Sequence, residues 1–165
     1  MAAKPAPKRQ FGGIIKLASS AEPLDILLKQ LHGSNARNGT VQIFDPAAII
    51  NATHLNGAYY NALESFKEKT NVSKSVSMEM LLFAGMTDQI SDAIKIAGAK
   101  SAKKFVVFAS TLAAYNRIKP RIKNVKAFAP TAAQQLKTAK RYGITQAKEL
   151  DHFVLQRMTL SRLND

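Results

Sequence analysis

Few residues of this chain are grouped in a way that could perform catalysis. Its three histidines, His32, His54 and His152, lie far apart, and none belongs to the H-x-x-x-H pair that holds a catalytic metal on one helix face. We interpret them as a turn residue, a packed helix residue and a strand-edge residue. The sequence contains no cysteine, no glycine-rich phosphate loop and no nucleophile elbow. We therefore expect no cofactor and no metal site.

Pairs of carboxylates at helical spacing remain as candidates for acid–base or Mg²⁺ chemistry. Two such pairs occur four residues apart, Glu64 with Glu68 and Asp88 with Asp92. Neighbouring lysines make a solvated helix surface the preferred interpretation of both pairs. Glu79 differs, because it lies between two methionines in an apolar segment; it is either a helix-surface residue or half-buried against a base. No set of groups fills the roles of a catalytic site, so we expect the protein not to be an enzyme.

The strongest chemical signal is a block of positive charge. Every charged residue between Asp92 and Glu149 is a lysine or an arginine, and this block accounts for the whole net charge of +13. Charges of one sign concentrate the electric field and attract phosphates. A basic surface that only keeps the protein soluble is one interpretation, but a nucleic acid partner is preferred. A membrane surface is less favoured, because the block lacks a long amphipathic helix with Trp or Phe on its apolar side.

The pattern of apolar residues predicts the elements that would position these charges. We expect strands at residues 11–17, 40–44, 104–110 and 152–160, and helices at 20–31, 45–66, 75–83, 87–98 and 131–142. Short helical turns are expected at 111–117 and 145–151, and an irregular basic stretch at 119–128. This order predicts an α/β fold. Specifically, it predicts a two-layer sandwich in which helices pack on one face of a mixed or antiparallel sheet of about four strands.

The length of 165 residues predicts one domain, residues 11–165, after a flexible basic tail at residues 1–10. No apolar run approaches the roughly 20 residues that cross a bilayer, and the N-terminus lacks the apolar core of a secretory signal. A cleaved organelle presequence is a less favoured interpretation of the tail, which lacks the amphipathic period of such segments. We expect a cytoplasmic protein with no membrane partner.

Three segments, in the right order, resemble one small protein family. The run "FDPAAIINATHLNGAYYNAL" is similar to the family's D-P-x-x-I-x-x-x-x-H-L-x-x-A-x-x-x-A-L pattern. The run "SVSMEMLLFAGMTDQISDAIKIAGAK" and the closing "RYGI…EL…FVLQRMTL" are similar to its later segments. The family is the kinase-binding subunit of the KEOPS complex (the TPRKB family), with the archaeal form preferred, and the likeness spans residues 11–163. The resemblance implies a non-catalytic protein with a two-layer α/β fold.

The resemblance also implies two partners: the small kinase-like ATPase subunit of KEOPS, and tRNA held by its single-stranded CCA end, for threonylcarbamoyladenosine modification. For RNA we predict phosphate contacts from the basic block, a stacking face from Tyr115 and a base-edge contact from Asn116. The predicted phosphate contacts are Lys95, Lys103, Lys104, Arg117, Lys119, Arg121 and Lys123. Core or edge packing is the alternative role of Tyr115.

For the ATPase subunit we predict an apolar helix face with small residues. Its candidates are His54, Leu55, Ala58, Ala84, Gly85, Met86, Gln89, Ile90 and Ile94. The alternative role of each apolar candidate is packing in the protein's own core, and an inward stripe is expected on the helix at 87–98, formed by Ile90, Ala93, Ile94 and Ala97.

Two other hypotheses apply to the whole chain. Residues 85–110 faintly resemble the kink-turn-binding ribosomal protein family, which would make the chain a stand-alone RNA-binding protein, although the glycine-rich loop of that family is missing. A small enzyme with an unfamiliar site ranks last.

Overall fold

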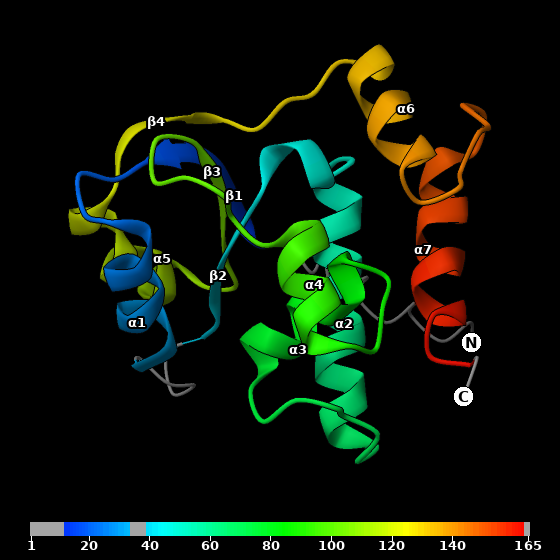
Figure 1. Ribbon diagram of the computed structural model, residues 1–165, viewed down its shortest axis with the longest axis horizontal. Helices are drawn as coiled ribbons and strands as arrows, with labels where there is room; N and C mark the ends of the chain where they lie inside the picture. The colour runs from blue at the N-terminus through cyan, green and yellow to red at the C-terminus, as the bar shows by residue number, and fades with distance from the viewer. Residues whose placement is uncertain (1–11, 34–38, 164–165) are drawn as a thin grey trace, which may run out of the picture.

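Four strands form one antiparallel sheet in the order β2–β3–β1–β4 (Figure 1). The computed structural model describes residues 12–33 and 39–163, so the expected tail at 1–10 lies outside the described residues. The strands are β1 (Ile14–Ser19), β2 (Val41–Phe44), β3 (Phe105–Ala109) and β4 (Lys123–Ala127). Within the described ranges, no helix has the length and apolar character that crossing a membrane requires.

Strand β3 runs through the centre of the sheet, and all of its residues are buried. Successive side chains of a strand point to opposite faces. Accordingly, Val106 and Phe108 join one apolar cluster, and Phe105, Val107 and Ala109 join another. The α/β class and a four-stranded antiparallel sheet with helices packed on it are confirmed. Helices cover both faces of this sheet, however, and not the single face that the sequence predicts.

The larger apolar cluster is formed with three consecutive helices (Figure 1). They are α2 (Ala52–Lys67), α3 (Val76–Ala84) and α4 (Ile90–Ala97). The helix predicted over residues 45–66 is divided in two: a short 3-10 helix, η1 (Pro46–Ala48), precedes α2. Asp45 caps η1 by accepting a hydrogen bond from the Ala47 amide. The side chain of Asn51 caps α2, and that of Ser75 caps α3. The caps fix where each helix begins, which sets the turns between them.

Two further helices, α1 (Leu24–Gly33) and α5 (Leu112–Ile118), cover the other face, and η2 (Lys119–Arg121) follows α5 (Figure 1). Helix α1 begins later than the sequence predicts. The hydroxyl of Ser20 accepts a hydrogen bond from the Glu22 amide and donates one to the Arg121 carbonyl at 2.7 Å. Ser20 therefore turns the chain before the helix and does not cap it.

The prediction of a strand at residues 152–160 is wrong, because these residues belong to the helix α7 (Leu150–Leu160). Val154 and Met158, four residues apart, are fully buried, whereas Leu155 is 39% exposed. This is the period of a helix, which the run of adjacent apolar residues hides in the sequence. Gly57 lets α7 approach α2, since a Cβ atom there would lie 2.4 Å from Leu155 Cδ2.

The prediction of an irregular stretch at residues 119–128 is also wrong, because this segment contains η2 and β4. Every residue of β4 is exposed, so no apolar pattern marks it. Backbone pairing with β1 forms the strand, and the Ser19 hydroxyl adds a hydrogen bond to the Lys123 carbonyl. Lysines on an edge strand discourage pairing with another chain. Strand β4 leads into α6 (Ala132–Lys140), which Thr131 caps by accepting a hydrogen bond from the Gln134 amide.

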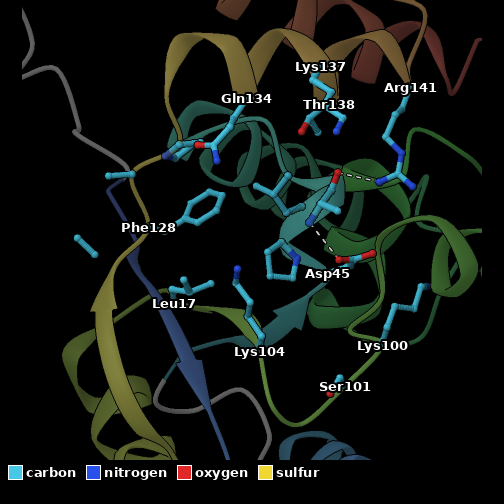
Figure 2. Close-up of a pocket in the computed structure, with 16 residues that line it drawn as sticks. Leu17, Asp45, Lys100, Ser101, Lys104, Phe128, Gln134, Lys137, Thr138 and Arg141 are labelled. Atoms are coloured by element: carbon cyan, nitrogen blue, oxygen red, sulfur yellow. Dashed lines mark hydrogen bonds between the residues drawn. The ribbon is translucent and has the colours of Figure 1, made fainter.

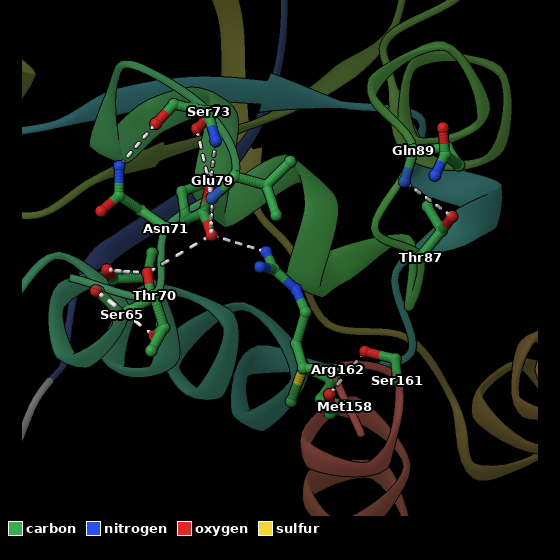
Figure 3. A network of polar contacts seen from close by, with 12 residues as sticks. Ser65, Thr70, Asn71, Ser73, Glu79, Thr87, Gln89, Met158, Ser161 and Arg162 are labelled. Carbon is green, nitrogen blue, oxygen red and sulfur yellow. Dashed lines mark hydrogen bonds and ion pairs between the residues drawn. The ribbon is translucent and has the colours of Figure 1, made fainter. Parts of the chain in front are cut away.

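Glu79 is completely buried, which resolves the choice that the sequence leaves open (Figure 3). Its carboxylate accepts hydrogen bonds from the amide and hydroxyl of Ser73, at 2.9 and 2.8 Å. It also forms an ion pair with Arg162 Nη2 at 2.6 Å. The Arg162 guanidinium lies over the ring of Phe83, 4.2 Å from its centroid. The network ties the loop before α3 to the end of α7.

Candidate functional site

A pocket of about 880 Å³ opens between η1, the loop before β3, the segment after β4, and α6 (Figure 2). Its lining includes the cationic side chains of Lys100, Lys104, Lys137 and Arg141. Asp45 is the one acidic residue among the lining residues. We call this cavity the basic pocket, since its surplus of positive charge favours an anionic ligand.

Two of these cations are held in place by backbone carbonyls. Arg141 Nη1 donates to the Ala47 carbonyl at 2.8 Å, and Lys100 Nζ donates to the Ile94 carbonyl at 2.9 Å. One carboxylate oxygen of Asp45 already accepts the hydrogen bond that caps η1. Lys104 points into the pocket (Figure 2). The part of the positive field that comes from Arg141 and Lys100 is therefore built into the fold before a ligand arrives.

The basic pocket also contains an aromatic face. Phe128, half-buried in the segment after β4, turns its ring toward the pocket (Figure 2). Proteins hold single-stranded nucleic acid by combining cations for the phosphates with aromatic rings on which bases stack. The pocket combines these two features.

The residues predicted to contact RNA do not form one site. Lys104 lines the basic pocket, and Lys103 is exposed beside it in the same loop. Lys95, on α4, lines a separate cavity. The remaining candidates lie on α5, η2 and the start of β4, and they are Tyr115, Asn116, Arg117, Lys119, Arg121 and Lys123. A continuous stretch of basic sequence is thus divided between separate regions of the surface.

Three of those remaining candidates have roles within the fold. Tyr115 packs against the apolar cluster under α5, which is the alternative role considered for it. Arg117 Nη2 donates to the Gly39 carbonyl at 2.9 Å. Arg121 Nη1 forms an ion pair with Glu22 at 2.6 Å. These contacts account for all three residues without a ligand.

Sequence reasoning missed most of the basic pocket: Lys100, Phe128, Lys137 and Arg141. The three cations were visible as part of the basic block, but nothing in their spacing shows that they converge. Their convergence depends on β4, which carries the chain from the edge of the sheet to α6. Phe128 is the aromatic residue at the end of that connection.

Helix α4 presents an uncovered apolar surface. Ile90 and Ile94 are 41% and 48% exposed, whereas Ala93 and Ala97 are fully buried. The prediction that all four residues point inward is therefore confirmed for Ala93 and Ala97 and wrong for Ile90 and Ile94. Gln89, just before the helix, is exposed, and Met86, in the α3–α4 turn, is half-buried. We call Ile90 and Ile94 the α4 surface.

The other residues predicted to contact a partner are core residues, which corrects that part of the prediction. The buried set is His54, Leu55, Ala58, Ala84 and Gly85. Helix α2, which carries the first three, packs against both α3 and α7. A partner cannot reach His54, Leu55 and Ala58 without separating these helices.

The buried ring of His54 joins two turns of the core. Its Nδ1 accepts a hydrogen bond from the Ile50 amide at 3.1 Å, so the ring proton resides on Nε2, which donates to the Ala84 carbonyl at 2.8 Å. Burial lowers the pKa of His54 to about 4, although the hydrogen bond to Ala84 acts in the opposite direction. The ring is neutral at physiological pH and positions the end of α3, just before α4.

This burial predicts a pH-dependent stability. The pKa of His54 lies below its usual 6.5, so its contribution is complete above pH 6.5 and is lost as the pH falls toward 4. The size of the pKa shift corresponds to a loss of about 3 kcal/mol in the free energy of unfolding between pH 6.5 and pH 4. Urea unfolding from pH 7 to 4.5 should show the free-energy difference between wild type and His54→Gln shrinking steadily. A difference that stays constant over this range would contradict the assignment.

The structure thus presents two surfaces suited to a partner: the basic pocket beside η1 and α6, and the apolar α4 surface. The family model described as "Kinase binding protein CGI-121" matches residues 24–162. The chain therefore belongs to this family of kinase-binding proteins. No curated protein matches the chain.

Proposed function

We propose that this protein is the kinase-binding subunit of a KEOPS complex. In this proposal it acts in the cytoplasm without catalysing a reaction, and it recruits tRNA by its single-stranded CCA end for threonylcarbamoyladenosine modification. Membership of the kinase-binding family supports the protein partner. The observation that carries the RNA role is the basic pocket, which combines cationic side chains with a half-buried aromatic ring.

The α4 surface is the proposed contact for the small kinase-like ATPase subunit. Two isoleucines more than two-fifths exposed lie four residues apart on one helix, with Gln89 at its start and Met86 in the turn before it. Exposed apolar side chains grouped in this way are typical of protein interfaces. The fully buried Ala93 and Ala97 fix the helix to the core, so the contact is presented on a rigid element.

The basic pocket is the proposed contact for the tRNA end. Lys104 and Lys137 would pair with phosphates, while the ring of Phe128 would stack on a base. The CCA end of tRNA is unpaired, so its bases are free to enter a pocket. Lys103, in the same loop as Lys104, would add to the attraction from outside the pocket.

Fluorescence anisotropy with two tRNAs, one intact and one lacking its terminal CCA, tests the RNA role over a series of salt concentrations. The proposal predicts tighter binding of the intact tRNA at every salt concentration. Equal affinities that weaken in parallel with salt would show phosphate attraction alone. Tighter binding of a kink-turn RNA would instead support the stand-alone RNA-binding alternative.

Reversing one charge in the basic pocket should weaken tRNA binding strongly. We expect Lys137→Glu to raise the Kd for intact tRNA by about tenfold or more, since it replaces a phosphate contact by a repulsive charge. Lys119→Glu makes the same change in the basic block but outside the pocket, and should raise the Kd by less than about threefold. If the two variants raise the Kd equally in the anisotropy measurement, the basic pocket is not the tRNA-binding site.

A further inference from the structure

A second cavity, of about 570 Å³, lies between the α3–α4 turn, α4, the α6–α7 connection and α7. Three cations line it: Lys95 from α4, Arg141 from the end of α6 and Arg157 from α7. No acidic residue is among its lining residues. We call it the Arg157 cavity.

The two guanidinium groups are fixed before any ligand binds. Arg157 Nε donates to the Tyr142 carbonyl at 3.1 Å, and Arg141 Nη1 donates to the Ala47 carbonyl at 2.8 Å. Gly143 leaves space for the first of them, since a Cβ atom there would lie 2.9 Å from Arg157 Nη2. The remaining N–H groups of both side chains are available, and guanidinium groups suit the oxygens of phosphates and carboxylates.

The Arg157 cavity offers charge but no open aromatic face. Tyr142, its aromatic lining residue, is only 9% exposed, and its hydroxyl donates to the Ala48 carbonyl at 2.6 Å. A base would therefore find no ring to stack on. The cavity suits an oxyanion and not a nucleobase.

Arg141 lines both the Arg157 cavity and the basic pocket, so the two cavities lie on either side of one side chain. We infer that a single-stranded RNA whose end occupies the basic pocket places a backbone phosphate in the Arg157 cavity, between Lys95, Arg141 and Arg157. The inference rests on the proposed RNA role and adds a second, separate phosphate site to it. The shared arginine favours one polyanionic strand, since such a strand can pass from the basic pocket to the Arg157 cavity along Arg141.

The length of the RNA tests this inference. The full-length protein would be titrated with fluorescent single-stranded RNAs that end in CCA and increase from three to about eight nucleotides. Wild type should show a step of about tenfold in affinity once the strand is long enough to reach the second cavity. The double variant Lys95→Gln/Arg157→Gln should bind the trinucleotide like wild type but lose the step, and its dependence on salt should fall.

Lys140→Gln is the matched control, because Lys140 is exposed on α6 and lines neither cavity. It should keep the step, and thermal melting should show all variants folded. A double variant that weakens every length equally, or a wild type without a step, would overturn the inference while leaving the basic pocket intact. A wild type that binds no RNA of any length would overturn the proposed RNA role as well. If RNA binding is unchanged and only the complex with the ATPase subunit weakens, the cavity holds an acidic group of that partner and the inference is wrong.

Discussion

Replacing Ile90 by aspartate should raise the Kd for the kinase-like ATPase subunit by about 1,000-fold, which corresponds to about 4 kcal/mol. The change places an unpaired carboxylate in an apolar contact, where desolvation opposes binding. The fold itself should tolerate it, because Ile90 is 41% exposed and an acidic side chain is favourable in the first turn of a helix. Isothermal titration calorimetry with the purified subunit measures the effect.

Leu112→Asp provides the control for the α4 surface. Leu112 is 65% exposed in the first turn of α5, on the opposite side of the sheet. The same charge is thus introduced at an equivalent helix position, and the affinity should stay within about twofold of wild type. An Ile90→Asp protein that folds and binds normally would exclude the α4 surface, and a Leu112→Asp protein that fails to bind would place the contact on α5.

Removing the guanidinium of Arg162 should lower the free energy of unfolding by about 4 kcal/mol, because it leaves the carboxylate of Glu79 buried without its counter-charge. Burial alone would raise the pKa of Glu79, but the hydrogen bonds from Ser73 and the charge of Arg162 outweigh it, and the net pKa lies below 4.5. The ion pair therefore stabilises the protein above pH 4.5 and loses its effect in acid. Urea unfolding of Arg162→Ala at pH 7 measures the loss.

Arg121→Ala is a matched control, because it breaks the other ion pair, to Glu22. The side chains of that pair are 35% and 33% exposed. Solvent screens such a pair, so its loss should lower the free energy of unfolding by less than about 1 kcal/mol. Equal losses for the two arginines would show that burial of Glu79 does not determine the effect. The difference in the free energy of unfolding between wild type and Arg162→Ala should also become smaller as the pH is lowered below 4.5.

The sequence predicts the elements that are marked by their own side chains. Strand β3 is continuous and β-branched, and a helical period of apolar residues marks α2, α3 and α6. Prediction from the sequence fails for β4, because its residues are all exposed and the strand forms only through pairing with β1. It also fails for α7, where consecutive apolar residues conceal the spacing of Val154 and Met158.

The candidate site is predictable only in part, for a related reason. The basic block identifies the charge that builds the basic pocket, and Lys104 is the predicted RNA contact that lines this pocket. Which cations converge depends on the path of β4 toward α6, which the sequence does not reveal. The exposure of Ile90 and Ile94 is hidden for another reason: their spacing is equally compatible with a core stripe, and only the packing of Ala93 and Ala97 decides it.

The central claim is that this chain connects a kinase-like subunit to a tRNA end through two different surfaces. The direct measurement is capture of labelled intact tRNA by the immobilised ATPase subunit, with and without this protein. The account predicts strong capture with wild type and none with Ile90→Asp, which cannot reach the subunit. It predicts bound protein but little tRNA with Lys137→Glu. Equal capture of tRNA in the presence and absence of this protein would contradict the account.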